Sequence, residues 1–113
     1  MPEYFHTTDA ATEILRVGFR DAEGSYGLAK TLLIGVFVAD SPLGFNEGAT
    51  GDEVLALTLA DSLDLDEWEL VEEHKPYREW CIPARVLNAR ARMVRLLTET
   101  ALDEVTAKRR PRP

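Results

Sequence analysis

The sequence has one cysteine, Cys81, and two histidines, His6 and His74, among its 113 residues. A single cysteine excludes an intramolecular disulfide framework, and these three residues have no local spacing typical of a zinc site. Neither glycine-rich phosphate-binding loop, GxGxxG or GxxxxGK[S/T], occurs in the chain. We therefore expect a fold that its hydrophobic core stabilises, with no bound metal.

Long apolar runs are also absent. No run approaches the roughly 18 residues of a membrane-spanning helix, and the first residues, MPEYFH, lack the basic and apolar regions of a signal peptide. These absences predict a chain that does not enter a membrane and works in the cytoplasm, and export by an unrecognised route stays open as the alternative. The composition, 45% hydrophobic and 29% charged, is typical of a globular domain. We expect one domain over residues 1–107 and a basic tail over residues 108–113.

Basic residues are fewer than acidic ones, and the formal net charge is −7. This charge disfavours non-specific binding of nucleic acid over the whole surface. The charges are also unevenly distributed, because residues 61–73 hold seven carboxylates and no Lys or Arg, whereas residues 80–98 hold four arginines and no carboxylate. Two interpretations stay open: the polarity orients an anionic ligand, or it reflects a solvated acidic surface beside a basic helix, which is the commoner case.

Hydrophobic periodicity and the positions of Gly and Pro predict the secondary structure. Apolar alternation or continuous apolar runs predict strands at residues 3–7, 32–39 (buried), 53–59, 66–72 and 77–83. Apolar residues three to four apart predict a helix at 10–17, which Gly18 ends, and a C-terminal helix at 86–108. The polar or glycine-rich segments 20–30 and 40–51 are predicted to be loops.

Three residues are candidates for chemistry on residue type alone. Cys81 lies in an apolar strand pattern, which favours an inert buried thiol. His6 is flanked by threonines that can orient an imidazole, although a lone histidine is more often structural. Glu79 stands between aromatic and apolar residues, so it needs a partner or a ligand if it is buried. The alternative is that Glu79 faces solvent beside Arg78.

Four short segments occur in a meaningful order: YFHTT (4–8), ILRVGF (14–19), GVFVAD (35–40) and REWCIP (78–83). Together they resemble the ADP-ribosyltransferase superfamily, in its diphtheria-toxin-like and poly-ADP-ribose-polymerase-like branch. That branch carries a His, Tyr, Glu triad on three strands, and the matching positions here are His6, Phe37 and Glu79. The chain departs from the pattern at Phe37, where Tyr is usual, and at Thr7, where Gly is usual.

The resemblance implies a fold and an activity. The fold would be α+β, with two small, mostly antiparallel sheets packed face to face, a helix after the first strand and a C-terminal helix. The activity would be transfer of ADP-ribose from NAD to a protein or nucleic-acid acceptor with release of nicotinamide, with NAD hydrolysis as a side or main reaction. NAD would be a substrate, and no metal would take part. Two alternatives stay open: a non-catalytic binding or regulatory module on the same fold, and a small antitoxin-like regulator with a chance resemblance.

The resemblance also implies a role for each matching residue. Glu79 would be catalytic, because in the family this carboxylate binds the 2′-hydroxyl of the nicotinamide ribose and stabilises the oxocarbenium-like cation. His6 would bind the adenine-side ribose, Phe37 would stack on the nicotinamide, and the backbone of Thr7 would bind the carboxamide. We therefore expect the side chains of His6, Phe37 and Glu79 to meet in one cleft.

Other residues are weaker candidates for binding NAD. Ser41 follows the second matching strand and offers a hydroxyl to the carboxamide, although at an offset unlike that of the family. A bound pyrophosphate needs a cation or a helix N-terminus nearby. Arg16, Arg20 and Lys30 lie between the first two matching motifs and are the expected suppliers of that positive charge.

Overall fold

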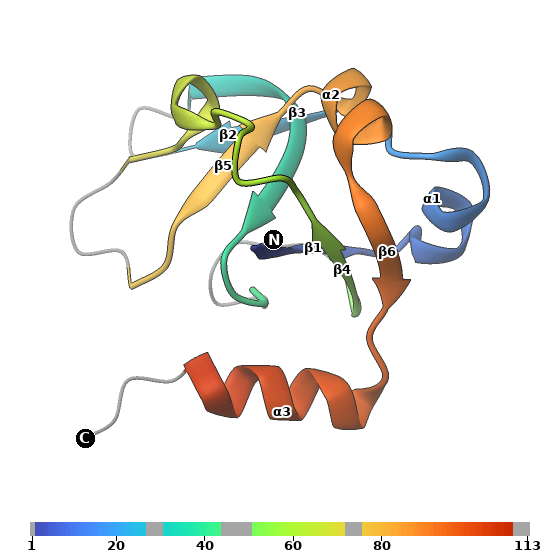
Figure 1. Cartoon of the computed structure of the whole chain (residues 1–113). Helices are drawn as coiled ribbons and strands as arrows, with labels where there is room; N and C mark the ends of the chain where they lie inside the picture. The colour runs from blue at the N-terminus through green and yellow to red at the C-terminus, as the bar shows by residue number, and fades with distance from the viewer. Residues whose placement is uncertain (1, 27–30, 44–50, 72–75, 110–113) are drawn as a thin grey trace.

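The computed structural model describes residues 2–26, 31–43, 51–71 and 76–109, and Figure 1 shows their arrangement. The strands are β1 (Glu3–Thr8), β2 (Ala22–Tyr26), β3 (Thr31–Ala39), β4 (Glu53–Thr58), β5 (Glu79–Ile82) and β6 (Arg92–Leu96). The helices are α1 (Ala11–Val17), α2 (Ala84–Arg90) and α3 (Glu99–Arg109), with a short 3₁₀ helix, η2 (Asp66–Trp68). The protein is therefore α+β, as the sequence predicts.

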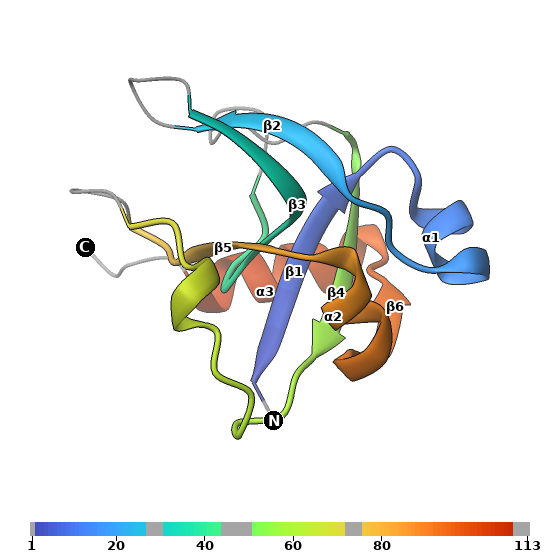
Figure 2. The same ribbon diagram turned by 90° about the horizontal axis from the view of Figure 1, so that it is seen from above.

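The six strands form one antiparallel sheet in the order β2-β3-β1-β4-β6, with β5 paired to β3. Strand β3 changes partners along its length: its first half pairs with β2 up to Gly35, and its second half pairs with β5 from Val36 onward. Figure 2 shows β3 turning sharply between these partners. The expected pair of separate sheets is therefore replaced by one bent sheet, because a single strand belongs to both parts.

A glycine permits this change of partner. A Cβ atom on Gly35 would lie 2.8 Å from the Sγ of Cys81 and 3.1 Å from the carbonyl oxygen of Ile82. Strand β5 can approach β3 this closely only because residue 35 has no side chain. Gly35 is thus needed where the sheet bends.

Two hydrophobic clusters lie on opposite sides of β4. Leu55 and Leu57 point into the larger cluster, which also contains side chains from α1, α2, β3 and β5. Val54 and Ala56 point into the smaller cluster, which α3 covers. Figure 1 shows α3 on its own beneath the sheet, apart from α1 and α2. Strand β4 is buried on both faces, since successive side chains of a strand point to opposite faces.

Several predicted elements are confirmed with small changes of boundary. The boundaries of strands β1, β4 and β5 and of helix α1 lie within two residues of the predicted ones. Helix α1 ends at Gly18, whose φ of 97° places it in the left-handed region that favours glycine. Within the described residues, no helix is long and apolar enough to cross a bilayer.

The strand predicted at residues 66–72 is wrong. Among the described residues the chain forms η2 there, followed by an isolated bridge between Glu69 and Trp80; residue 72 lies outside the described residues. The N–H of Asp66 donates to the carboxylate of Asp64 at 2.9 Å. An aspartate that binds the backbone two residues on favours a turn over an extended chain, and the alternating sequence did not reveal this competition.

The loop predicted at residues 20–30 contains a strand, since β2 pairs along the first half of β3; residues 27–30 lie outside the described residues. Strand β3 itself is buried only in part, because Leu32 and Ile34 are 60% and 62% exposed. The continuous apolar run therefore does not mark continuous burial. The first half of β3 and its partner β2 form an edge of the sheet in Figure 2, and none of their described residues belongs to the larger hydrophobic cluster.

The single C-terminal helix predicted at residues 86–108 is also wrong, because the chain forms α2, β6 and α3. Met93 has a positive φ of 51°, which a continuing helix does not allow. The hydroxyl of Thr98 accepts a hydrogen bond from the N–H of Ala101 at 3.1 Å and caps α3. Helix α3 includes Lys108 and Arg109, so the expected tail begins inside it, and residues 110–113 lie outside the described residues.

Candidate functional site

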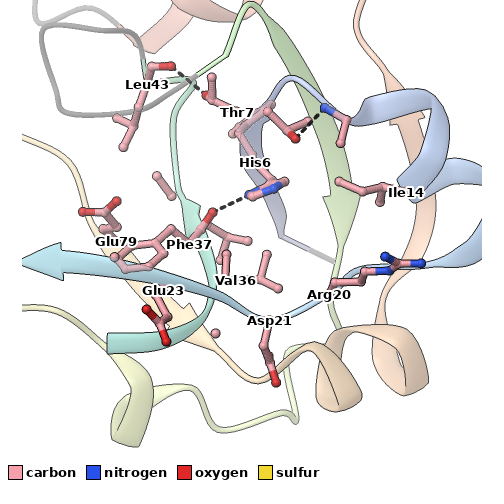
Figure 3. Close-up of a pocket in the computed structure, with 18 of the residues that line it drawn as sticks. His6, Thr7, Ile14, Arg20, Asp21, Glu23, Val36, Phe37, Leu43 and Glu79 are labelled. Atoms are coloured by element: carbon pink, nitrogen blue, oxygen red, sulfur yellow. Dashed lines mark hydrogen bonds between the residues drawn. The ribbon is translucent and has the colours of Figure 1, made fainter. Parts of the chain in front are cut away.

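A cavity of about 510 Å³ opens between β1, α1, β2 and β3 (Figure 3). His6, Thr7, Phe37 and Glu79 all line it. These residues come from three strands, and in sequence Phe37 is 31 residues from His6 and 42 from Glu79. The volume lies in the range of roughly 300–1,000 Å³ that is typical of small-molecule sites.

The strand register explains why Glu79 reaches this cavity. Glu79 pairs with Ala39, and Cys81 pairs with Phe37, so these side chains share one face of the sheet. The alternate residues of the two strands, such as Trp80, point into the larger hydrophobic cluster instead. The alternation that buries Trp80 therefore directs the Glu79 side chain to the cavity.

His6 is oriented by a backbone carbonyl. Its Nδ1 donates a hydrogen bond to the carbonyl oxygen of Phe37 at 2.7 Å, and its ring packs edge-on against Phe19 at 5.8 Å. Burial lowers the pKa of His6 below 6.5, and the hydrogen bond to Phe37 opposes this only in part. The imidazole is thus neutral at pH 7 with its proton on Nδ1, so Nε2 is an acceptor.

Thr7 ties β1 to the segment that follows β3. Its hydroxyl donates a hydrogen bond to the carbonyl oxygen of Leu43 at 2.7 Å, and Figure 3 shows this bond at the edge of the cavity. The side chain that replaces the family's usual glycine therefore has a structural partner. Leu43 is itself buried and lines the same cavity.

Phe37 provides an aromatic wall. A Cβ atom on Gly24 would lie 2.9 Å from the Cζ of Phe37, so the ring packs directly against the backbone of β2. In Figure 3 the ring lies between the carboxylates of Glu23 and Glu79. Glu79 is 9% exposed, whereas Glu23 is exposed.

The described lining carries more negative than positive charge. Its four carboxylates belong to Glu13, Asp21, Glu23 and Glu79, and its one guanidinium belongs to Arg20. The Asp21 carboxylate accepts a hydrogen bond from the N–H of Ala84 at 2.7 Å, at the start of α2. Asp21 therefore has a structural partner across the fold.

The residues expected to contribute a positive charge or a hydroxyl to NAD binding do not all line the cavity. Arg20 lines the cavity and forms an exposed ion pair with Glu13 at 3.4 Å. Arg16, at the end of α1, and Ser41, after β3, are not among the lining residues. Lys30 lies outside the described residues.

Cys81 is 8% exposed, and burial raises the pKa of its thiol. The prediction that the thiol of Cys81 is buried is therefore confirmed. Within the part of the chain that the structure describes, no group of three or more His, Cys, Asp or Glu side chains is arranged to hold a metal ion.

The sequence did not predict that β2 contributes a wall of the cavity, which includes Glu23 and Gly24. Both residues stand in the polar segment predicted to be a loop. Gly24 allows the ring of Phe37 to pack against the backbone of β2 and does not form a turn. In a sequence, a glycine in either place looks the same.

No family model matches the chain, and comparison with curated proteins and with solved structures gives no match.

Proposed function

We propose that the cavity binds NAD and that the protein transfers ADP-ribose from NAD to an acceptor, with release of nicotinamide. The observation that carries the proposal is the meeting of His6, Phe37 and Glu79 in one cavity. Their distance in sequence makes this arrangement a property of the fold rather than of local spacing. On this proposal the bent antiparallel sheet is a compact ADP-ribosyltransferase-like fold.

Glu79 is the catalytic residue of the proposed reaction. The bond between the ribose C1′ and the nicotinamide nitrogen breaks, and its electron pair leaves with nicotinamide. The ribose becomes oxocarbenium-like, and the largely buried carboxylate of Glu79 stabilises that positive charge. An oxygen or nitrogen of the acceptor then bonds to C1′ and releases its proton to solvent. In NAD hydrolysis, the oxygen of water takes this place.

The other lining residues bind NAD. The Phe37 ring offers a flat face for nicotinamide, although it lacks the hydroxyl of the usual tyrosine. The backbone of Thr7 binds the carboxamide in this proposal, while its hydroxyl donates to the carbonyl oxygen of Leu43. The Nε2 of His6 accepts a hydrogen bond from the adenine-side ribose, and Arg20 supplies positive charge for the pyrophosphate.

A non-catalytic binding module is the second candidate function. The lining favours it in one respect, because a wall with four carboxylates and one guanidinium disfavours the pyrophosphate of NAD. Such a module would bind a ligand in the same cavity without breaking a bond. The two candidates differ in whether nicotinamide is released.

Replacing Glu79 separates the two candidates. Glu79→Gln keeps the size of the side chain but removes its charge, so we expect turnover to fall while NAD still binds. Loss of one preorganised electrostatic contact lowers the rate by a factor of about 100 to 1,000. Free nicotinamide measures the reaction, and calorimetric titration with NAD measures binding.

Two variants are controls for this experiment. Glu53→Gln changes a carboxylate on β4 outside the cavity lining and is expected to keep both turnover and binding. His6→Ala is expected to weaken NAD binding, because its partner is the distant ribose. Unchanged nicotinamide release by Glu79→Gln would exclude Glu79 as the catalytic carboxylate. NAD binding without any nicotinamide release by the unmutated protein would favour the binding module.

A further inference from the structure

We infer that Arg78 is a positioning residue that fixes the direction of the Glu79 side chain through a clamp on the start of β5. The inference rests on the proposed function, because the position of Glu79 matters most for the reaction proposed above. The clamp consists of Arg78, Glu69, Leu70 and Asp40, which come from three segments of the chain.

The side chain of Arg78 makes the first part of the clamp. Its Nε donates to one carboxylate oxygen of Glu69 at 2.9 Å, and its Nη2 donates to the other at 2.7 Å. The guanidinium also lies over the ring of Trp80, 5.1 Å from its centroid. A bidentate pair stacked on an aromatic ring fixes the orientation as well as the position of the guanidinium.

The backbone makes the second part. The N–H of Arg78 donates to the carboxylate of Asp40, and the N–H of Asp40 donates to the carbonyl of Arg78, both at 3.0 Å. The N–H of Leu70 donates to the carbonyl of Glu79 at 2.8 Å. The peptide groups on both sides of Glu79 are therefore bonded to segments outside β5.

The position of Glu79 in its strand explains why a clamp is needed. Glu79 is the first residue of a four-residue strand, and its pairing with Ala39 is the last of the ladder with β3. Terminal residues of a short strand fray unless other contacts hold them. A displacement of about 1 Å costs roughly 100-fold in rate when a catalytic group must be aligned with a reacting atom.

The test compares Arg78 variants with a matched control. Arg78→Ala removes the bidentate pair, and we expect kcat for nicotinamide release to fall about 10-fold to 100-fold with little change in the KM for NAD. Arg78→Lys keeps the charge but loses the bidentate fork, so its kcat should lie between those of the unmutated protein and Arg78→Ala. Arg95→Ala is the control, because Arg95 also pairs with a glutamate, Glu3, at 3.2 Å and has a similarly exposed side chain.

A double variant tests the route of the effect. If Arg78 acts through Glu69, then Glu69→Gln with Arg78→Ala lowers kcat no further than Arg78→Ala alone. The amide of Leu70 should also exchange its hydrogen faster in Arg78→Ala, because that amide donates to the carbonyl of Glu79. Arg95→Ala should change neither quantity.

Two results would overturn the inference. One is a kcat in Arg78→Ala equal to that of Arg95→Ala, and the other is a fall in kcat that matches only a lower folded fraction. If the unmutated protein releases no nicotinamide, the proposed function fails, but the clamp remains testable. The NMR signal of the Glu79 carboxyl carbon then reports its surroundings, and equal shifts in Arg78→Ala and Arg95→Ala would show that Arg78 does not position it.

Discussion

His6 shows how one side chain connects the pH of the solution to the stability of the fold. Its ring is held by the carbonyl of Phe37 and by Phe19, and burial lowers its pKa. The unfolded chain takes up a proton near the ordinary pKa of 6.5, whereas the folded protein does so only at a lower pH. Between these values the unfolded state binds more protons, so stability falls as the pH falls.

We therefore expect His6→Gln to reduce the pH dependence of stability. The unmutated protein should lose more free energy of unfolding between about pH 7.5 and about pH 5 than the variant does, because glutamine does not titrate. Urea unfolding at the two pH values measures both losses. Equal losses in the two proteins would show that His6 does not titrate differently on folding.

At the scale of elements, the segment between α2 and α3 is the clearest case of tertiary control. Strand β6 pairs with β4 through Leu96, Arg95 and Arg92, and a bulge interrupts the ladder between Arg92 and Arg95. Met93 lies in this irregular stretch with a φ of 51°, and its side chain is 74% exposed. A left-handed backbone is unfavourable for methionine, and the exposed side chain offers little compensation.

Met93→Gly is accordingly expected to stabilise the protein by about 0.5–1 kcal/mol, because glycine adopts this φ without a Cβ penalty. Met93→Ala removes nearly the same side chain but keeps the Cβ, so it should leave stability almost unchanged. Urea unfolding of the two variants measures the difference. A glycine variant less stable than the alanine variant would show that the positive φ carries no strain.

At the scale of the whole molecule, stability is divided unequally between the two hydrophobic clusters. The larger one contains Leu57, which is fully buried in the cluster that includes side chains of α1 and α2. The smaller one depends on α3, whose Leu102 is only partly buried. The sheet separates the clusters, so a change in one leaves the packing of the other intact.

Leu57→Ala should therefore destabilise the protein far more than Leu102→Ala does. We expect a loss of about 2–5 kcal/mol for the buried leucine, since a cavity remains, and about 1 kcal/mol or less for the partly buried one. The same substitution at both positions makes the comparison direct. Equal losses in urea unfolding would show that α3 contributes as much to stability as the larger cluster.

The sequence by itself determined the elements in which local chemistry and burial agree. Strand β4 and helix α1 follow from apolar periodicity, and Gly18 follows from the left-handed conformation that ends the helix. It also indicated His6, Phe37 and Glu79 as candidate site residues, because the order of their motifs resembles that of the His, Tyr, Glu triad. None of these predictions requires knowledge of which strands pair.

Only the tertiary structure decided where local patterns were ambiguous. The spacing of apolar residues at 86–108 suits one helix, yet pairing with β4 and the turn at Met93 form β6 there. In sequence Gly24 and Gly35 look like glycines that form turns, but each allows the close approach of a neighbour that is distant in sequence. The cavity and the clamp on Glu79 join segments far apart in the chain, and such contacts depend on packing that sequence periodicity does not encode.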